Sequence, residues 1–126
     1  MILKNELKPL REVLSKFRHQ DKILIALLYG SYASGTLHKR SDIDLALFIK
    51  AKDKEEEIEI IDEILMSSEK DISILRLDDN DESPFVVKEA LKGMHLAAPD
   101  SDTFYEVSCR VLHDIEEIRF RRSLSG

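Results

Sequence analysis

The sequence predicts an α/β (α+β) fold, in which a small mixed sheet is flanked by helices, in a single domain over residues 1–126. Two short runs, residues 23–29 (ILIALLY) and 42–49 (DIDLALFI), have the length and the apolar content of strands. The segments before and after them carry apolar residues three and four positions apart, which is the spacing of an amphipathic helix. A chain of 126 residues is typical of one domain with one hydrophobic core.

The composition is that of a folded acidic protein. Hydrophobic residues make up 43% of the chain and charged residues 35%, with a net charge of -6. This balance disfavours a disordered chain, and it disfavours direct binding to nucleic acid, which needs a basic surface. The single cysteine, Cys109, leaves no internal disulfide and favours a reducing compartment. Because residues 23–29 are too short to span a membrane and no signal peptide is visible, we expect a cytoplasmic protein.

The first elements follow from apolar spacing and from punctuating residues. A helix is expected over residues 7–18, since Pro9 is tolerated only in a first turn and the apolar positions are Leu7, Leu10, Val13, Leu14 and Phe17. Residues 23–29 are apolar throughout, as expected of a central strand that is buried on both faces. Gly30 ends that strand, and residues 31–36 are expected to form a turn or a short helix.

Residues 42–49 alternate as a strand with two different faces. One face carries Ile43, Leu45, Leu47 and Ile49, and the other carries Asp42, Asp44, Ala46 and Phe48. Residues 54–66 return to helical spacing, with Asp53 placed to cap this helix.

The last third of the chain predicts one strand and two helices. Residues 71–77 (DISILRL) have the pattern of a third strand, and the acidic loop DDNDES follows it. A short helix is expected over residues 84–92, and residues 94–98 form a short strand or extended chain. The last helix is expected over about residues 103–121. Its apolar face either packs on the sheet of this domain or docks a partner together with the basic residues 119–122.

Two carboxylates on one side of the second strand predict a metal site. Asp42 and Asp44 project from the same face of a strand, where they repel each other unless a cation lies between them. Oxygen ligands of this kind suit Mg²⁺ or Mn²⁺ together with substrate phosphates. Taken alone, the pair is also explained by an edge strand whose polar face lies in water.

The Gly30-Ser31 pair makes the metal interpretation more specific. Glycine lets the backbone approach a ligand closely, and a helix that starts at Ser31 would offer free N–H groups to a phosphate. Such a phosphate would lie near Asp44 if the two strands are neighbours. A P-loop is excluded, because Thr36 and Leu37 follow Gly35 where a lysine and a Ser or Thr are required.

The combined motif resembles a known family. Gly30-Ser31, followed after ten residues by Asp42-x-Asp44, resembles the signature of the DNA polymerase beta-like nucleotidyltransferase superfamily. The surrounding LYGSYASG and RSDIDLALF, then a helix and a third strand led by an aspartate, resemble its minimal nucleotidyltransferase branch. The resemblance covers roughly residues 20–95, and it implies the nucleotidyltransferase fold.

The resemblance also implies roles for individual residues. Gly30 and Ser31 would bind the β- and γ-phosphates of a nucleoside triphosphate, and Asp42 and Asp44 would bind two Mg²⁺ ions, with Mn²⁺ as the alternative. Asp71 matches the third carboxylate of the family, as a metal ligand and catalytic residue.

Two other charged residues are further candidates for the site. Asp78 is the second choice for the third carboxylate, in a loop where solvation also explains it. Arg40 would neutralise phosphate charge, although a solvated basic turn explains it equally well.

Members of this branch are often paired with a HEPN-domain toxin. The resemblance implies an antitoxin that moves AMP from ATP onto a tyrosine of that toxin, as a protein adenylyltransferase in a hetero-oligomer. Two alternatives stay open: a nucleotidyltransferase that acts on a small molecule, and an antitoxin without catalysis that neutralises its partner by binding.

Overall fold

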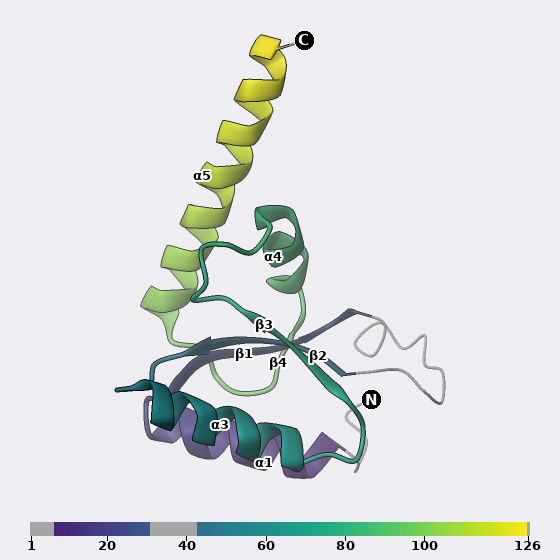
Figure 1. The fold of residues 1–126 in the computed structure, drawn as a ribbon, viewed down its shortest axis with the longest axis vertical. Helices are drawn as coiled ribbons and strands as arrows, with labels where there is room; N and C mark the ends of the chain where they lie inside the picture. The colour runs from purple at the N-terminus through teal and green to yellow at the C-terminus, as the bar shows by residue number, and fades with distance from the viewer. Residues whose placement is uncertain (1–6, 31–42, 126) are drawn as a thin grey trace.

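The computed structural model describes residues 7–30 and 43–125, and these residues form a mixed sheet with helices on both faces (Figure 1). The strands are β1 (Ile23–Tyr29), β2 (Ile43–Ile49), β3 (Ile72–Arg76) and β4 (Met94–His95), in the order β3-β2-β1-β4. β2 is antiparallel to β1 and parallel to β3, and β4 pairs antiparallel with β1. The predicted α/β class is therefore confirmed, and the second strand is next to the first, which is the condition set for the predicted phosphate site.

Helices α1 (Lys8–His19) and α3 (Lys54–Met66) cover one face of the sheet (Figure 1). They pack on the apolar side of β2, and this first cluster includes Leu10, Leu14, Phe17, Ile43, Leu45, Leu47, Ile60 and Ile64. Pro9 stands in the first turn of α1, as expected. Asp53 caps α3, because its carboxylate accepts a hydrogen bond from the backbone N–H of Glu56 at 2.8 Å.

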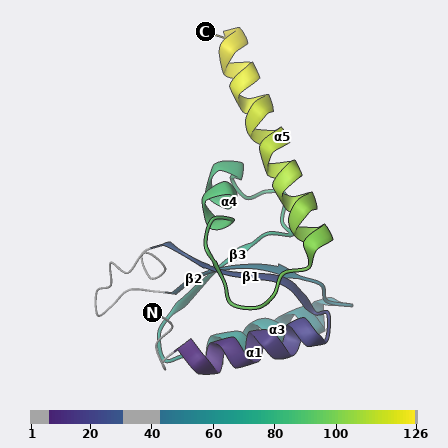
Figure 2. The ribbon, with the colours of Figure 1, turned by 180° about the vertical axis from the view of Figure 1, so that it is seen from behind.

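Helices α4 (Pro84–Ala90) and α5 (Ser101–Ser125) lie over the opposite face (Figure 2). A second cluster joins them to the sheet through Ile25, Leu27, Ala46, Leu75, Val87, Ala90, Val107, Val111 and Ile115. The alternation of β2 thus divides its side chains between two cores, as the sequence pattern predicts. The apolar face of α5 packs on this domain's own sheet, which is the first of the two alternatives considered for it.

The start of α5 differs from the sequence expectation. The helix begins at Ser101 and ends at Ser125, and both ends lie outside the predicted range 103–121. Asp100 caps it, because one carboxylate oxygen accepts hydrogen bonds from the backbone N–H of Thr103 at 3.1 Å and from its hydroxyl at 2.6 Å. A capping aspartate three residues upstream therefore extends the helix beyond the start expected at Thr103.

Among the helices that the structure describes, none combines the length and the apolar character that a membrane span requires.

Candidate functional site

Asp44 lies near the start of β2, an inner strand of the sheet, and has a neighbouring strand on each side. In β2 it is in register with Tyr29 of β1 and with Ser73 of β3. Its strand neighbours, Ile43 and Leu45, are buried in the cluster beneath α1 and α3. Asp44 therefore projects to the opposite face, toward the side of the sheet that carries α4 and α5, and there it is half-buried.

Gly30 lies directly against the carboxylate of Asp44. A Cβ atom built on Gly30 would be 2.4 Å from Oδ2 of Asp44 and 3.2 Å from its Cγ. The backbone of Gly30 also has a φ of +77°, a conformation that L-residues with a side chain rarely adopt. Glycine is thus required here for two separate reasons, and its missing side chain leaves the space that the carboxylate occupies.

Asp71 lies immediately before β3, at the same end of the sheet. Its carbonyl oxygen accepts a hydrogen bond of 2.9 Å from the backbone N–H of Ile43. Because Ile43 is in register with Ile72, Asp71 stands one position earlier, at the level of residue 42. Side chains alternate along a strand, so Asp71 belongs to the same face as Ser73 and Asp44. Its side chain is exposed and accessible to a ligand.

Asp78, the second choice for the third carboxylate, is engaged elsewhere. Its two carboxylate oxygens accept hydrogen bonds from Nε and Nη2 of Arg76 at 3.0 and 2.7 Å. Nη1 of the same guanidinium donates to Glu57 of α3 at 2.6 Å. The hydrogen bond from Arg76 is the main cause that lowers the pKa of Glu57. Asp78 therefore belongs to an ion-pair network that ties β3 to α3, and Asp71 is the better candidate.

Tyr29 and Glu82 are site neighbours that were not singled out from the sequence. Burial raises the pKa of the Tyr29 hydroxyl, and the negative charges of Asp44 and Glu82 raise it further. Tyr29 could have been found from its position one residue before Gly30, because the pairing of β1 with β2 then places it beside Asp44. Glu82 belongs to the acidic loop after β3, and nothing in that loop's sequence distinguishes it from its neighbours.

Three predicted site residues, Ser31, Arg40 and Asp42, lie outside the residues that the structure describes. The others, Gly30, Asp44 and Asp71, come from the ends of three adjacent segments of the sheet. Asp44 and Asp71 offer only oxygen ligands. The space where a Cβ of residue 30 would stand is occupied by the carboxylate of Asp44. These features fit a hard divalent cation such as Mg²⁺, bound together with phosphate oxygens.

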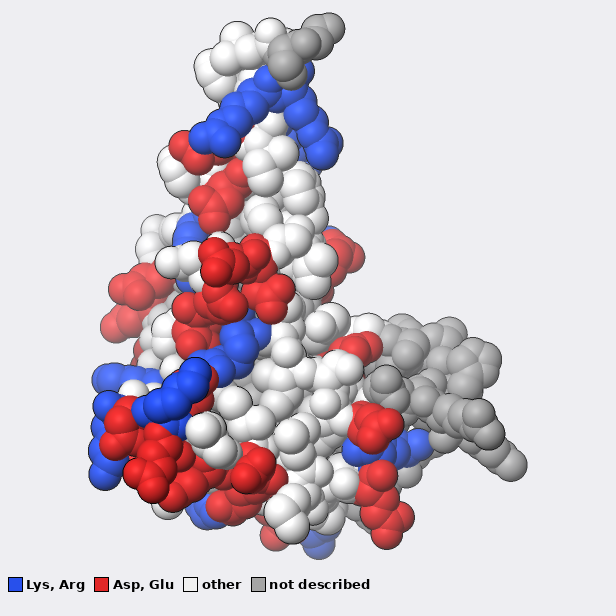
Figure 3. All heavy atoms as spheres, in the orientation of Figure 1, with Lys and Arg blue, Asp and Glu red and all other residues white. Residues whose placement is uncertain are grey.

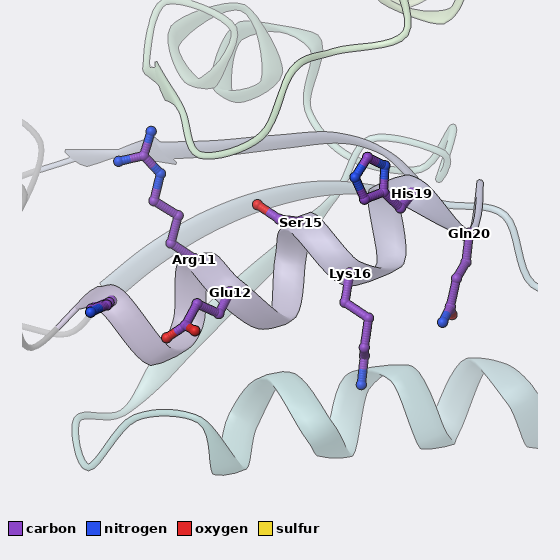
Figure 4. Close-up of a pocket in the computed structure, with 7 residues that line it drawn as sticks. Arg11, Glu12, Ser15, Lys16, His19 and Gln20 are labelled. Atoms are coloured by element: carbon purple, nitrogen blue, oxygen red, sulfur yellow. The ribbon is translucent and has the colours of Figure 1, made fainter.

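A hollow on the outer surface of α1 is separate from this site (Figure 4). Its lining residues come from α1 and the residue after it: Lys8, Arg11, Glu12, Ser15, Lys16, His19 and Gln20. Since α1 packs on the face of the sheet opposite to Asp44, this hollow is not part of the candidate catalytic centre.

The mixed sheet, with a glycine bend after β1 and carboxylates at β2 and before β3, defines the nucleotidyltransferase class. Residues 11–102 match the family described as Polymerase beta, Nucleotidyltransferase. This match spans most of the chain, and the chain belongs to that family. The resemblance inferred from the Gly-Ser and Asp-x-Asp spacing is confirmed.

Solved structures of toxin–antitoxin complexes contain chains of similar architecture. One, a toxin–antitoxin with AMP-PNP, gives a TM-score of 0.66 at 18% identity over 90% of this chain and 93% of that chain. A mutant of the toxin–antitoxin MntA-HpeT gives 0.67 at 17% identity over 91% and 93%. A tri-AMPylated Shewanella oneidensis HEPN toxin in complex with an MNT antitoxin gives 0.62 at 14% identity over 94% and 93%.

At these identities the likeness shows a shared fold. A comparison with curated protein sequences gave no match.

Proposed function

We propose that this protein is a metal-dependent adenylyltransferase that acts as an antitoxin by moving AMP from ATP onto a tyrosine of a HEPN-domain toxin. The observation that carries the proposal is the contact between Gly30 and the Asp44 carboxylate, at the same end of the sheet as Asp71. Membership of the nucleotidyltransferase family supports the reaction class. A similar fold in complexes with AMP-PNP and with an AMPylated HEPN toxin supports the nucleotide and the acceptor.

The proposed roles follow from the chemistry of each side chain. Asp42, Asp44 and Asp71 would hold two Mg²⁺ ions, or Mn²⁺, which neutralise phosphate charge and lower the pKa of the acceptor hydroxyl. The backbone at Gly30 and the hydroxyl of Ser31 bind the β- and γ-phosphates, with Arg40 as an additional cation.

The acceptor oxygen forms a bond to the α-phosphorus, and the bond from that phosphorus to the pyrophosphate oxygen breaks. Asp71, on the acceptor side, takes the proton of the hydroxyl.

Asp71 is exposed, and this agrees with an acceptor tyrosine that is carried on the surface of a separate protein. The partner is expected to form a hetero-oligomer with this chain, and both are expected to act in the cytoplasm.

Incubation with ATP labelled at the α-phosphate, Mg²⁺ and a candidate HEPN partner tests the proposal. Label on a partner tyrosine that is lost with Asp44→Asn supports it, provided that circular dichroism shows the variant folded. Label on a small acceptor would assign a small-molecule nucleotidyltransferase instead. A tight complex with no label transfer would assign an antitoxin that acts by binding alone, and a fully active Asp44→Asn variant would remove the metal assignment.

A further inference from the structure

We propose that the C-terminal part of α5 is a self-association surface, where two copies of this chain pair antiparallel about a two-fold axis that crosses the helix at the level of Ile118. This inference goes beyond the proposed function and does not depend on it. Figures 1 and 2, which view the molecule from opposite sides, both show the end of α5 projecting beyond α4 and the sheet. The surface consists of residues 112–124.

The projecting part of α5 has few contacts with the rest of the described protein. Val107, Val111 and Ile115 are buried against the sheet layer, and Ile118 is half-buried. The residues from 119 to 124 are all exposed. A short helical segment without tertiary packing is marginally stable in water, so this segment is expected to gain stability from a partner.

Exposed apolar side chains form a row along this segment. Leu112, Phe120 and Leu124 are 55%, 59% and 74% exposed. With Glu116 they occupy every fourth position, which forms one continuous ridge on a helix surface. Ridges of this type pack against the same ridge of a second helix in the commonest class of helix crossing in globular proteins.

The charges along the same segment change sign at Ile118. Asp114, Glu116 and Glu117 precede it, and Arg119, Arg121 and Arg122 follow it. Figure 3 shows basic side chains gathered near the tip of α5, with acidic side chains below them. In an antiparallel pair about Ile118, each acidic cluster lies beside the basic cluster of the other copy.

A second copy is the occupant that matches both patterns. The ridge is centred on the level of Ile118, so that in an antiparallel pair each Leu112 meets Leu124 of the other copy and each Phe120 lies against Glu116 of the other copy. The charged residues that flank the ridge change sign at the same level, with Glu116 and Glu117 before it and Arg119 and Arg121 after it. Self-complementarity of this kind is the property of a two-fold interface between identical chains. One helical ridge buries less area than a permanent dimer interface, so the association is expected to be weak.

Sedimentation equilibrium of the purified full chain, across a roughly hundredfold concentration range, tests the proposal. The average mass is expected to rise from the 14.5 kDa of one chain toward twice that value. The double variant Phe120→Ser/Leu124→Ser should remain a monomer and should unfold at the same temperature, because both side chains are mostly exposed.

Ile58→Ser is the matched control, since Ile58 is 52% exposed but lies on α3, and it should leave association unchanged. A chain that stays monomeric throughout, or a dimer that survives the double variant, would overturn the proposal.

A charge exchange tests the antiparallel arrangement. Glu116→Lys/Glu117→Lys and Arg119→Glu/Arg121→Glu should each weaken self-association, because each places like charges opposite one another. An equimolar mixture of the two variants should associate at least as well as the unmodified chain, since one basic surface then meets one acidic surface. Failure of the mixture to associate would contradict this arrangement. Binding of this surface to a different protein by a chain that never dimerises would assign it to that protein instead.

Discussion

The carboxylate of Asp44 occupies the space that a side chain at Gly30 would need, with Oδ2 only 2.4 Å from the position of the missing Cβ. This relationship joins the end of β1 to the face of β2 that carries Asp44. It explains why glycine follows the first strand, and it places an acidic group beside backbone that is free to approach a phosphate.

Gly30→Ala is expected to impair metal binding more than folding. The methyl group displaces the Asp44 carboxylate, and the left-handed backbone alone costs about 1–2 kcal/mol of folding free energy. Urea unfolding and Mn²⁺ titration measure the two effects. In an Asp44→Ala background, the cost of Gly30→Ala in folding free energy should fall to that of the backbone conformation. An equal cost in both backgrounds would show that the contact with Asp44 does not matter.

Substitutions of Asp71 and Asp78 should have different effects, the first on AMP transfer and the second on stability. Asp71→Asn is expected to reduce AMP transfer by roughly a hundredfold or more, because it removes a proposed metal ligand, and to leave the unfolding temperature nearly unchanged. Asp78→Asn removes one partner of Arg76 and should lower the unfolding free energy by about 1–2 kcal/mol, without effect on transfer by the folded protein. The opposite result would identify Asp78 as the third carboxylate.

The Tyr29 hydroxyl should report the charge of the site. Its pKa is raised by burial and by Asp44 and Glu82, so Asp44→Asn or Glu82→Gln should lower it toward the ordinary value of 10.0. Absorbance of the phenolate is measured in a Tyr32→Phe/Tyr105→Phe background, in which Tyr29 is the remaining tyrosine. Asp79→Asn changes another carboxylate of the same acidic loop, at an exposed position, and serves as the control. If the Asp79 variant shifts the pKa of Tyr29 as much as the Glu82 variant does, the assignment of Glu82 as the neighbour of Tyr29 is wrong.

His95 should make the protein sensitive to mild acid. Burial lowers the pKa of this imidazole below 6.5, and within the described residues its buried Nδ1 has no hydrogen-bond partner. The unfolded chain therefore binds the proton more readily, so the contribution of neutral His95 is present above pH 6.5 and is lost as the pH falls below it.

Urea unfolding at several pH values measures this loss. His95→Leu should remove the loss of unfolding free energy that begins as the pH falls below 6.5, whereas His113→Leu, at an exposed position, should retain it. Asp100 contributes only at lower pH, because hydrogen bonds from Thr103 hold its pKa below 3.8. An unchanged pH profile in the His95 variant would exclude this imidazole as the cause.

The order of elements and the two faces of the sheet could be predicted from the sequence, because each depends on local patterns. The alternation in residues 43–49 assigns Leu45 and Leu47 to one core and Ala46 to the other, whatever surrounds them. The Gly-Ser and Asp-x-Asp spacing assigned Gly30 and Asp44 to one predicted site on the condition that the two strands are neighbours, and the pairing of β1 with β2 meets that condition.

Other features depend on contacts between residues far apart in the chain. Asp71 and Asp78 are both acidic residues at an end of the third strand, and only Arg76, held in turn by Glu57 of α3, shows which of them is occupied. Strand register likewise decided that Tyr29 lies beside Asp44. The periodicity of the last helix predicted one apolar face, but not that its final turns would extend beyond the body.

By itself, the sequence determined which residues form strands and helices, which face each side chain takes, and where the acidic motif lies, because backbone geometry imposes periods of 2 and 3.6 residues on any chain. Only the tertiary structure decided that Asp78 is held in an ion pair with Arg76, and which part of α5 stays uncovered. Those outcomes depend on long-range packing, and no local pattern carries that information.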